Sequence, residues 1–136
     1  MTVYVLDSSA LIRYVDNEAG AARIEQILNA CACWQAELCI SAVQWGEVAG
    51  NLRQRFGASE EKRILSSLLP SEAKITPVSG ERAARAADLK VDRKLAYADA
   101  FAIELTMDSP EHVLVTADFD FEAVSDLAQI EFLPAK

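Results

Sequence analysis

The chain has 136 residues, with 51% hydrophobic and 25% charged side chains and a formal net charge of −8. This length suits one domain with one sizeable core, so we expect residues 1–136 to fold as a single unit. No apolar run approaches the ~18 residues of a membrane span, and MTVYVLD lacks the basic start of a signal peptide, so we expect a cytoplasmic protein without a membrane segment.

Short apolar runs rich in β-branched residues alternate with helical patterns along the chain. In chain order we predict a strand at 3–6, helices at 9–15 and 21–32, a strand at 38–41, helices at 42–56 and 59–69, a strand at 75–78, helices at 80–94 and 95–107, and strands at 112–116 and 129–133. Strands separated by helices predict parallel βαβ units. The expected fold is therefore α/β, a three-layer α/β/α sandwich around a central, mainly parallel sheet of about five strands.

Three local signals refine the boundaries of these elements. Ser41 and Gln44 match the S-x-x-Q capping box, which opens a helix, and Gly57 fits the stop of the same helix. Pro77 predicts that its strand ends there or lies at an edge of the sheet, since proline cannot donate a ladder hydrogen bond.

Cysteine and histidine usage excludes the common disulfide and zinc frameworks. The cysteines are Cys31, Cys33 and Cys39, an odd number that argues against a closed disulfide set. The only histidine, His112, is far from them in sequence, so a zinc site would be incomplete. We interpret the cysteines as small core residues in a reducing compartment.

The charge is unevenly distributed along the chain. Ten of the thirteen cations lie between Arg53 and Lys94, whereas Leu95 to Ala135 holds nine acids and no Lys or Arg. The net negative charge alone argues against nucleic acid as a partner, because phosphate contacts need cations. Concentrated acids beside a basic section nevertheless suit a metal-assisted site that acts on a polyanion.

Acids follow two of the predicted strands directly. Asp7 follows the first strand, and Asp118 and Asp120 follow the fourth in VLVTADFDF. Each has an ordinary explanation, as a helix N-cap or a turn residue. However, ligands of open α/β sheets bind beyond the carboxyl ends of the strands, so these acids stand where chemistry is expected. Phe119 and Phe121 alternate with the acids, which predicts that one set packs inward and the other points to the cleft.

Asp99 is the most informative single residue. Its helix is apolar almost all the way round, which predicts burial, and its only other acid is Glu104. A buried carboxylate is costly unless it is paired or binds a metal. A salt bridge is the alternative, but no Lys or Arg follows until the last residue, so a partner such as Arg13 would have to come from elsewhere.

Glu47 lies in the first half of the helix after the second strand and by itself resembles a solvated helix residue. It gains weight because that half of the helix points to the same sheet edge as the other acids. Carboxylates gathered there need raised pKa values or a cation. Oxygen donors without His or Cys select Mg²⁺ or Mn²⁺, and such ions activate water for phosphodiester hydrolysis.

Four blocks of the sequence together resemble the PIN-domain family, and more narrowly the VapC-type toxins of bacterial toxin–antitoxin pairs. The blocks are VYVLDSSALIRYV, ISAVQWGEVAG, LAYADAFAIEL and LVTADFDFEAV. One block alone is a weak signal, but all four occur in order, at family-like spacing and over essentially the whole chain. One departure is Asp118, since the fourth block often has Asn there. The extra negative charge favours a second metal.

The resemblance implies a Mg²⁺- or Mn²⁺-dependent endoribonuclease, the toxin of a type II pair, which cleaves RNA by metal-activated water. It implies that Asp7, Asp99 and an acid of the fourth block bind metal, with Asp118 and Asp120 dividing that role in a way left open. Glu47 would bind a second ion or a metal-bound water and act as general base. The implied partners are RNA, a cognate antitoxin that blocks the active site, and a second copy in a homodimer.

Supporting residues follow from the same resemblance. Ser8 and Thr116 look like residues that orient the carboxylates. Arg13, just after the first motif, is the best candidate to contact RNA phosphate. Trp45 could stack on a base, although packing in the core or a dimer explains it better. Weaker phosphate candidates, equally explained as solvated helix residues, are Arg53, Arg55, Arg82, Arg85, Arg93 and Lys94.

Other functions fit the sequence less well. A phosphate-receiving signalling domain needs an Asp at the end of a central strand and a late Lys, but the third strand ends TPVS and the last third has no Lys before Lys136. An aspartyl phosphatase needs D-x-D-x-T after the first strand, which DSSAL does not supply. The serious alternative is a degenerate PIN-like module that binds RNA or protein without cleaving. All of the acidic positions are filled, which argues for the enzyme.

Overall fold

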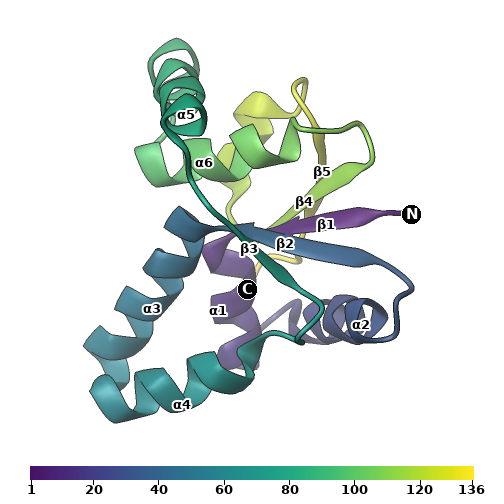
Figure 1. Ribbon diagram of the computed structural model, residues 1–136, viewed down its shortest axis with the longest axis vertical. Coiled ribbons are helices and arrows are strands. Elements are labelled where there is room, and N and C mark those ends of the chain that lie inside the picture. Colours follow the sequence, from purple (N-terminus) through teal and green to yellow (C-terminus); the bar gives the residue numbers. More distant parts are fainter.

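Five strands form one sheet in which every neighbouring pair is parallel (Figure 1). In the computed structural model, which describes residues 1–136, the order is β3-β2-β1-β4-β5. The strands are β1 (Val3–Leu6), β2 (Glu37–Ser41), β3 (Lys74–Thr76), β4 (His112–Thr116) and β5 (Gln129–Phe132). The predicted α/β fold is confirmed, and the sheet is wholly rather than mainly parallel.

Helices cover both faces of the sheet, which gives the three layers (Figure 1). One face carries α1 (Ser8–Val15), α2 (Ala21–Ala32), α3 (Ala42–Phe56) and α4 (Ala58–Leu68). The other face carries α5 (Gly80–Arg93), α6 (Tyr97–Thr106) and a 3₁₀ segment, η1 (Phe119–Val124). No helix is both long and apolar enough to cross a membrane.

The strands supply both cores by alternation of their side chains. Leu6 belongs to the core beneath α1 to α4, while its neighbour Val5 belongs to the core beneath α5 and α6. In β4 the same division separates Val115 from Leu114. Because both faces are covered, the strands are continuously apolar, as is typical of parallel sheets.

Most predicted boundaries agree with the structure within two residues, but the predicted capping box was wrong and one helical segment was not predicted. Gly57 ends α3 with a φ of 87°, as expected. Ser41 caps α3 by accepting from Val43 N, yet the side chain of Gln44 does not complete a capping box, because it bonds elsewhere. The segment after β4 forms η1, which the sequence pattern did not predict.

The order of the strands fixes where a site can form. From the central β1 the chain proceeds to β2 and β3 on one side, and later places β4 and β5 on the other. The strand order therefore reverses between β1 and β4, and ligands of such sheets bind beyond the carboxyl ends at this point. Asp7 follows β1 and Asp118 follows β4 closely, so the two acids flank the reversal.

Candidate active site

Asp7 is the most firmly held acid of the site. It is 2% exposed, at the junction of β1 and α1. Its Oδ1 accepts from Ser9 Oγ at 2.8 Å and from Ala10 N at 3.0 Å, and its Oδ2 accepts from Thr116 Oγ1 at 2.6 Å. The carboxylate thus caps α1, as the ordinary explanation predicted, and is also tied to β4. Its rotamer is fixed before any ligand arrives.

The environment of Asp7 disfavours its charge despite these bonds. Burial raises its pKa from 3.8 to about 6, against the opposing effect of the bonds from Thr116, Ala10 and Ser9, and the negative charge of Asp118 adds to the rise. A structural cap has no need of this arrangement, because an exposed Asp caps equally well. A raised pKa in a cleft is typical of functional sites.

Asp99 lies in the first turn of α6 and faces the other acids. Burial raises its pKa from 3.8 to about 6, and the charges of four further carboxylates add to this in the order Asp118, Asp7, Glu47, Asp120. The structure therefore brings all five predicted acids into one electrostatically coupled group. Asp99 is partly exposed, whereas the apolar pattern of its helix predicted full burial.

Gln44 links the segments that carry these acids. Its side chain is fully buried on α3, one turn before Glu47. The Oε1 atom accepts from Ser8 N at 2.7 Å, and Nε2 donates to Ala98 O at 2.6 Å. Ser8 follows Asp7 and Ala98 precedes Asp99, so one amide fixes the spacing between the β1–α1 junction and the start of α6.

Asp118 and Asp120 are not equivalent. Asp118 is half-buried and caps η1, with Oδ1 accepting from Asp120 N at 2.9 Å. Its charge acts most strongly of the four on Asp99 and also acts on Asp7, whereas Asp120 is exposed and acts least strongly on Asp99. Glu47 is exposed as well and reaches the group from α3.

The donor set fits a hard cation in chemistry. No three of the His, Cys, Asp or Glu side chains are already arranged to hold a metal ion. Burial raises both pKa values, neighbouring carboxylates add to the rise, and no Lys or Arg opposes it; Mg²⁺ or Mn²⁺ prefers such oxygen donors. Asp7, Asp99 and Asp118 are the acids that share this charge most strongly.

Of the two predicted supporting residues, Thr116 bonds a carboxylate of the site and the side chain of Ser8 does not. Thr116 Oγ1 donates to Asp7 and accepts from Asp118 N at 2.9 Å, a geometry that suits the orienting role predicted for it. The serine that bonds Asp7 is Ser9 and not Ser8, because Ser8 begins α1 and its backbone N–H points to Gln44 instead. Ser9 Oγ also accepts from Ala117 N at 2.9 Å, which ties α1 to the end of β4.

The predicted phosphate contacts also need correction. Arg13 is only 9% exposed, and its NH1 donates to Ala19 O and Pro134 O, so it is not a free surface cation. Trp45 packs against the core, as its preferred interpretation predicted. Most of the weaker candidates bind acids of this chain: Arg53, Arg55, Arg82, Arg85 and Arg93 are all ion-paired.

Two residues of the site were missed from the sequence. Ser9 stands in the DSSAL motif beside the serine that was chosen, and helix geometry alone does not distinguish the two positions. Gln44 was assigned to a helix cap, whereas the structure buries its side chain on the side of α3 that faces α1 and α6. Neither residue carries a charge, so a search for acids does not find them.

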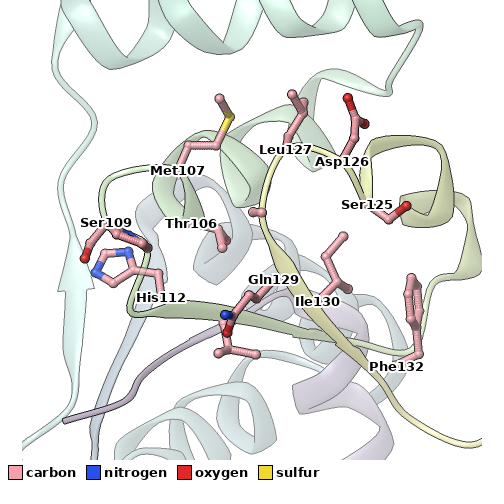
Figure 2. A pocket seen from close by; sticks show the side chains of 13 residues that line it. Thr106, Met107, Ser109, His112, Ser125, Asp126, Leu127, Gln129, Ile130 and Phe132 are labelled. Atoms are coloured by element: carbon pink, nitrogen blue, oxygen red, sulfur yellow. The ribbon is translucent and has the colours of Figure 1, made fainter.

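The surface has two hollows, of which one adjoins the acids at the carboxyl ends of the strands and the other lies away from them. A groove of about 520 Å³ is lined by Ser9 and Asp118 and so adjoins the acids. A wider hollow of about 830 Å³ lies between the end of α6 and β5, with Met107, His112 and Ile130 in its wall (Figure 2). None of the five acids lines the wider hollow, so we associate the site with the groove.

Known proteins with this fold include several toxin–antitoxin structures. VapBC2 from Rickettsia felis, bound to a promoter DNA fragment, has a TM-score of 0.74 at 13% identity, covering 98% of this chain and 100% of that one. VapC20 from Mycobacterium tuberculosis, described as a Sarcin-Ricin loop cleaving toxin, has 0.74 at 17%, covering 96% and 99%. A toxin–antitoxin complex from Klebsiella pneumoniae has 0.71 at 21%, covering 98% and 99%.

At these identities the likeness concerns the fold. No curated protein sequence matches the chain. The family model of the PIN domain, in contrast, matches residues 4–127, a span that includes Asp7, Asp99 and Asp118. The chain therefore belongs to the PIN domain family.

Proposed function

We propose that this chain is a Mg²⁺- or Mn²⁺-dependent endoribonuclease and the toxin of a type II toxin–antitoxin pair. The observation that carries the proposal is the coupled group of five carboxylates at the point where the strand order reverses. Two of them, Asp7 and Asp99, have pKa values raised to about 6. Such a group suits a cation and a phosphodiester better than it suits a stable core.

The residues divide the work according to their surroundings. Asp7, Asp99 and Asp118 would hold the ion, and we favour Asp118 over Asp120 because its charge acts more strongly on the other two. Exposed Glu47 is free to take a second ion or to accept a proton from the attacking water. The bound ion would supply Lewis-acid stabilisation of charge on the phosphate and a water nucleophile at neutral pH.

The neutral side chains keep the carboxylates in place. Thr116 and Ser9 donate to opposite oxygens of Asp7 and so fix the orientation of its carboxylate. Gln44 bonds the backbone next to Asp7 and the backbone next to Asp99, and so fixes the spacing between these two acids. Preorganisation of this kind supports catalysis, because even a small displacement of the reacting groups lowers the rate.

The biological role rests on the family and on the similar structures. VapC20 is described as a toxin that cleaves the Sarcin-Ricin loop, and the Klebsiella pneumoniae structure is described as a toxin–antitoxin complex. By analogy we propose a cognate antitoxin as the protein partner and a homodimer as the assembly. A degenerate PIN-like module that binds RNA or protein without cleaving is the alternative, and the complete set of acids argues against it.

Cleavage of cellular RNA tests the enzymatic proposal. Total RNA incubated with the protein and Mn²⁺ should yield new ends at defined positions, mapped by sequencing, and EDTA should suppress them. Asp7→Asn is the matched control, because it keeps the shape of the side chain and removes the charge. Ends that persist in EDTA, or Mn²⁺ binding by calorimetry that Asp7→Asn leaves unchanged, would contradict metal-dependent cleavage.

Expression tests the role as a toxin. Induction of the wild-type chain alone should stop growth, whereas Asp7→Asn should not, and co-expression of the cognate antitoxin should restore growth. Light scattering on the purified protein measures whether it is a dimer. Harmless expression of active, metal-loaded protein would contradict the toxin role and leave the nuclease proposal intact.

A further inference from the structure

The groove beside Asp118 has features that the catalytic proposal does not use. It has a volume of about 520 Å³ and shares Ser9 and Asp118 with the acidic site. Its other walls include Phe119 and the cations Arg13 and Lys136. An aromatic ring and two cations directly beside a phosphodiester site suggest a place for a nucleotide.

Phe119 is an exposed ring in a fixed position. Its two neighbours are Asp118 and Asp120, and its own side chain is 41% exposed. The ring stacks on Phe132 of β5, with centroids 5.5 Å apart and planes 11° apart. Phe132 stands at the opposite end of the wider hollow from His112 and does not line the groove (Figure 2).

The fixed ring is suited to stacking. Phe121, two residues further along η1, is 1% exposed and belongs to the core. Phe119 and Phe121 face different sides of η1, because a 3₁₀-helix has three residues per turn. Phe119 is therefore the aromatic of this motif that remains available. Since Phe132 already orders the ring, a base that stacks on it costs little additional side-chain entropy.

The groove holds two cations, Arg13 and Lys136, beside two acids, Glu18 and Asp118. Arg13 donates to two uncharged carbonyl oxygens, at 2.7 and 2.8 Å, which fix its position. Lys136 pairs with Glu18 at 2.7 Å on the rim and is largely exposed. In a chain of net charge −8, this placement favours a phosphate of the same strand that is cleaved at Asp118.

We propose that this groove binds one nucleotide of single-stranded RNA next to the scissile phosphate, with its base stacked on Phe119. The inference rests on the proposed nuclease function and adds a base-binding subsite to it. Stacking accepts any base, so the subsite would contribute affinity and position more than sequence preference. The groove shares Asp118 with the acidic site, which is why we favour RNA over a protein segment as its occupant.

The test uses an RNA defined by the wild-type protein. A synthetic RNA of about 12 nucleotides, spanning a cleavage site mapped in cellular RNA, is labelled for fluorescence anisotropy and kept uncleaved by EDTA, because the proposed hydrolysis requires the metal. Phe119→Ala and Phe119→Leu should weaken its binding about 10-fold, while Phe119→Tyr stays close to wild type. When Mn²⁺ is added so that the RNA is cleaved, Phe119→Ala should have a higher KM and nearly the same kcat, because the contact is the same in the ground and transition states.

Removing the base provides the second arm. An abasic position that removes the stacked base should weaken wild-type binding by the same factor and should have no further effect in Phe119→Ala. Trp34→Ala is the matched control, since Trp34 is 74% exposed and lies just before β2, at the amino end of the strands, whereas the acids lie at their carboxyl ends. Thermal melts of each variant confirm folding.

The outcomes separate this inference from the function on which it rests. Equal RNA binding by wild type and Phe119→Ala, or a Leu variant that binds like wild type, would overturn the subsite while cleavage still stands. Loss of antitoxin binding by Phe119→Ala with unchanged RNA binding would overturn it in favour of a protein contact. If the wild type neither cleaves nor binds RNA, the proposed function fails and the subsite fails with it.

Discussion

Helix α6 carries two acids, Asp99 and Glu104, whose surroundings are opposite. Glu104 is 4% exposed and is surrounded by cations: Arg82 NH1 lies 3.0 Å from both of its oxygens, and Arg85 Nε lies 3.2 Å from one. Asp99, on the first turn, faces Asp118, Asp7, Glu47 and Asp120 instead.

This difference shows how a structural acid is distinguished from a functional one. Burial alone does not separate them, because Glu104 is the more buried of the two. What separates them is compensation: the protein supplies two arginines from α5 to Glu104 and only further carboxylates to Asp99. A site left negative by its own fold supports the proposal that a cation from solution binds there.

Replacing Asp99 should give the largest effect on activity. Asp99→Asn removes the charge and keeps the shape, so RNA cleavage should fall about 1000-fold or more while the protein stays folded. Initial rates on a mapped RNA and circular dichroism measure the two properties. Without metal the variant should be more stable than wild type, because a repelled charge is gone. Cleavage retained by this variant would refute the assignment.

Replacing Glu104 should reverse that pattern. Glu104→Gln leaves Arg82 and Arg85 without their buried partner, so the free energy of unfolding should fall by about 3 kcal/mol, while cleavage per folded molecule is kept. Urea denaturation measures the loss. The control is Glu60→Gln in the exposed Arg63–Glu60 pair, which should change stability little. A comparable small change in Glu104→Gln would contradict the structural role.

The metal-free protein should be more stable at pH 5 than at pH 7.5. The pKa values of Asp7 and Asp99 are raised to about 6, so between pH 4 and 6 the folded state binds more protons than the unfolded state, and stability falls as pH rises through 6. We expect a difference of about 2 kcal/mol from the two groups together. Denaturation in EDTA at both pH values measures it.

The contrast with other acids isolates this effect. The pKa values of Asp108 and Asp126 are lowered by their arginines, so the stability that they contribute is lost only below about pH 4, outside this window. Mn²⁺ at pH 7.5 should restore the stability, since it binds the ionised form. Asp99→Asn should reduce the difference to the part that Asp7 contributes. A wild-type profile that rises from pH 5 to 7.5 in EDTA would show that these carboxylates are already compensated.

The sequence predicts much of this contrast, because the fold follows from local patterns. Apolar runs alternating with helices predicted the parallel sheet, and the rule for carboxyl ends of strands placed Asp7 and Asp118 at one edge. Asp99 stood out since its helix offers no cation. The same reasoning found no cation for Glu104, because Arg82 and Arg85 come from the preceding helix and only the tertiary packing of α5 on α6 brings them close.

The roles of the neutral residues of the site could not be predicted from local sequence patterns. Gln44 bonds backbone groups 36 and 54 residues away, a relation that no spacing in the sequence encodes. The 3₁₀ geometry of η1, which exposes Phe119 and buries Phe121, is likewise set by packing of the segment on β5 and α6. Patterns of charge and hydropathy locate groups that are costly to bury, and uncharged positioning groups have no such signature.

The smallest effect that we expect separates the two serines after Asp7. Ser9→Ala removes the donor to Asp7 Oδ1 and the acceptor for Ala117 N, so Mn²⁺ affinity measured by calorimetry should fall about 10-fold, the usual cost of losing an orienting partner. Ser8→Ala is the matched control and should bind Mn²⁺ as wild type does, because Ser8 contributes its backbone N–H, which alanine keeps. Asp7 is otherwise held by Thr116 and Ala10, which limits the loss to one bond of three. A larger effect of Ser8→Ala than of Ser9→Ala would mean that the carboxylate turns toward Ser8 when metal binds, and would restore the assignment that the sequence first indicated.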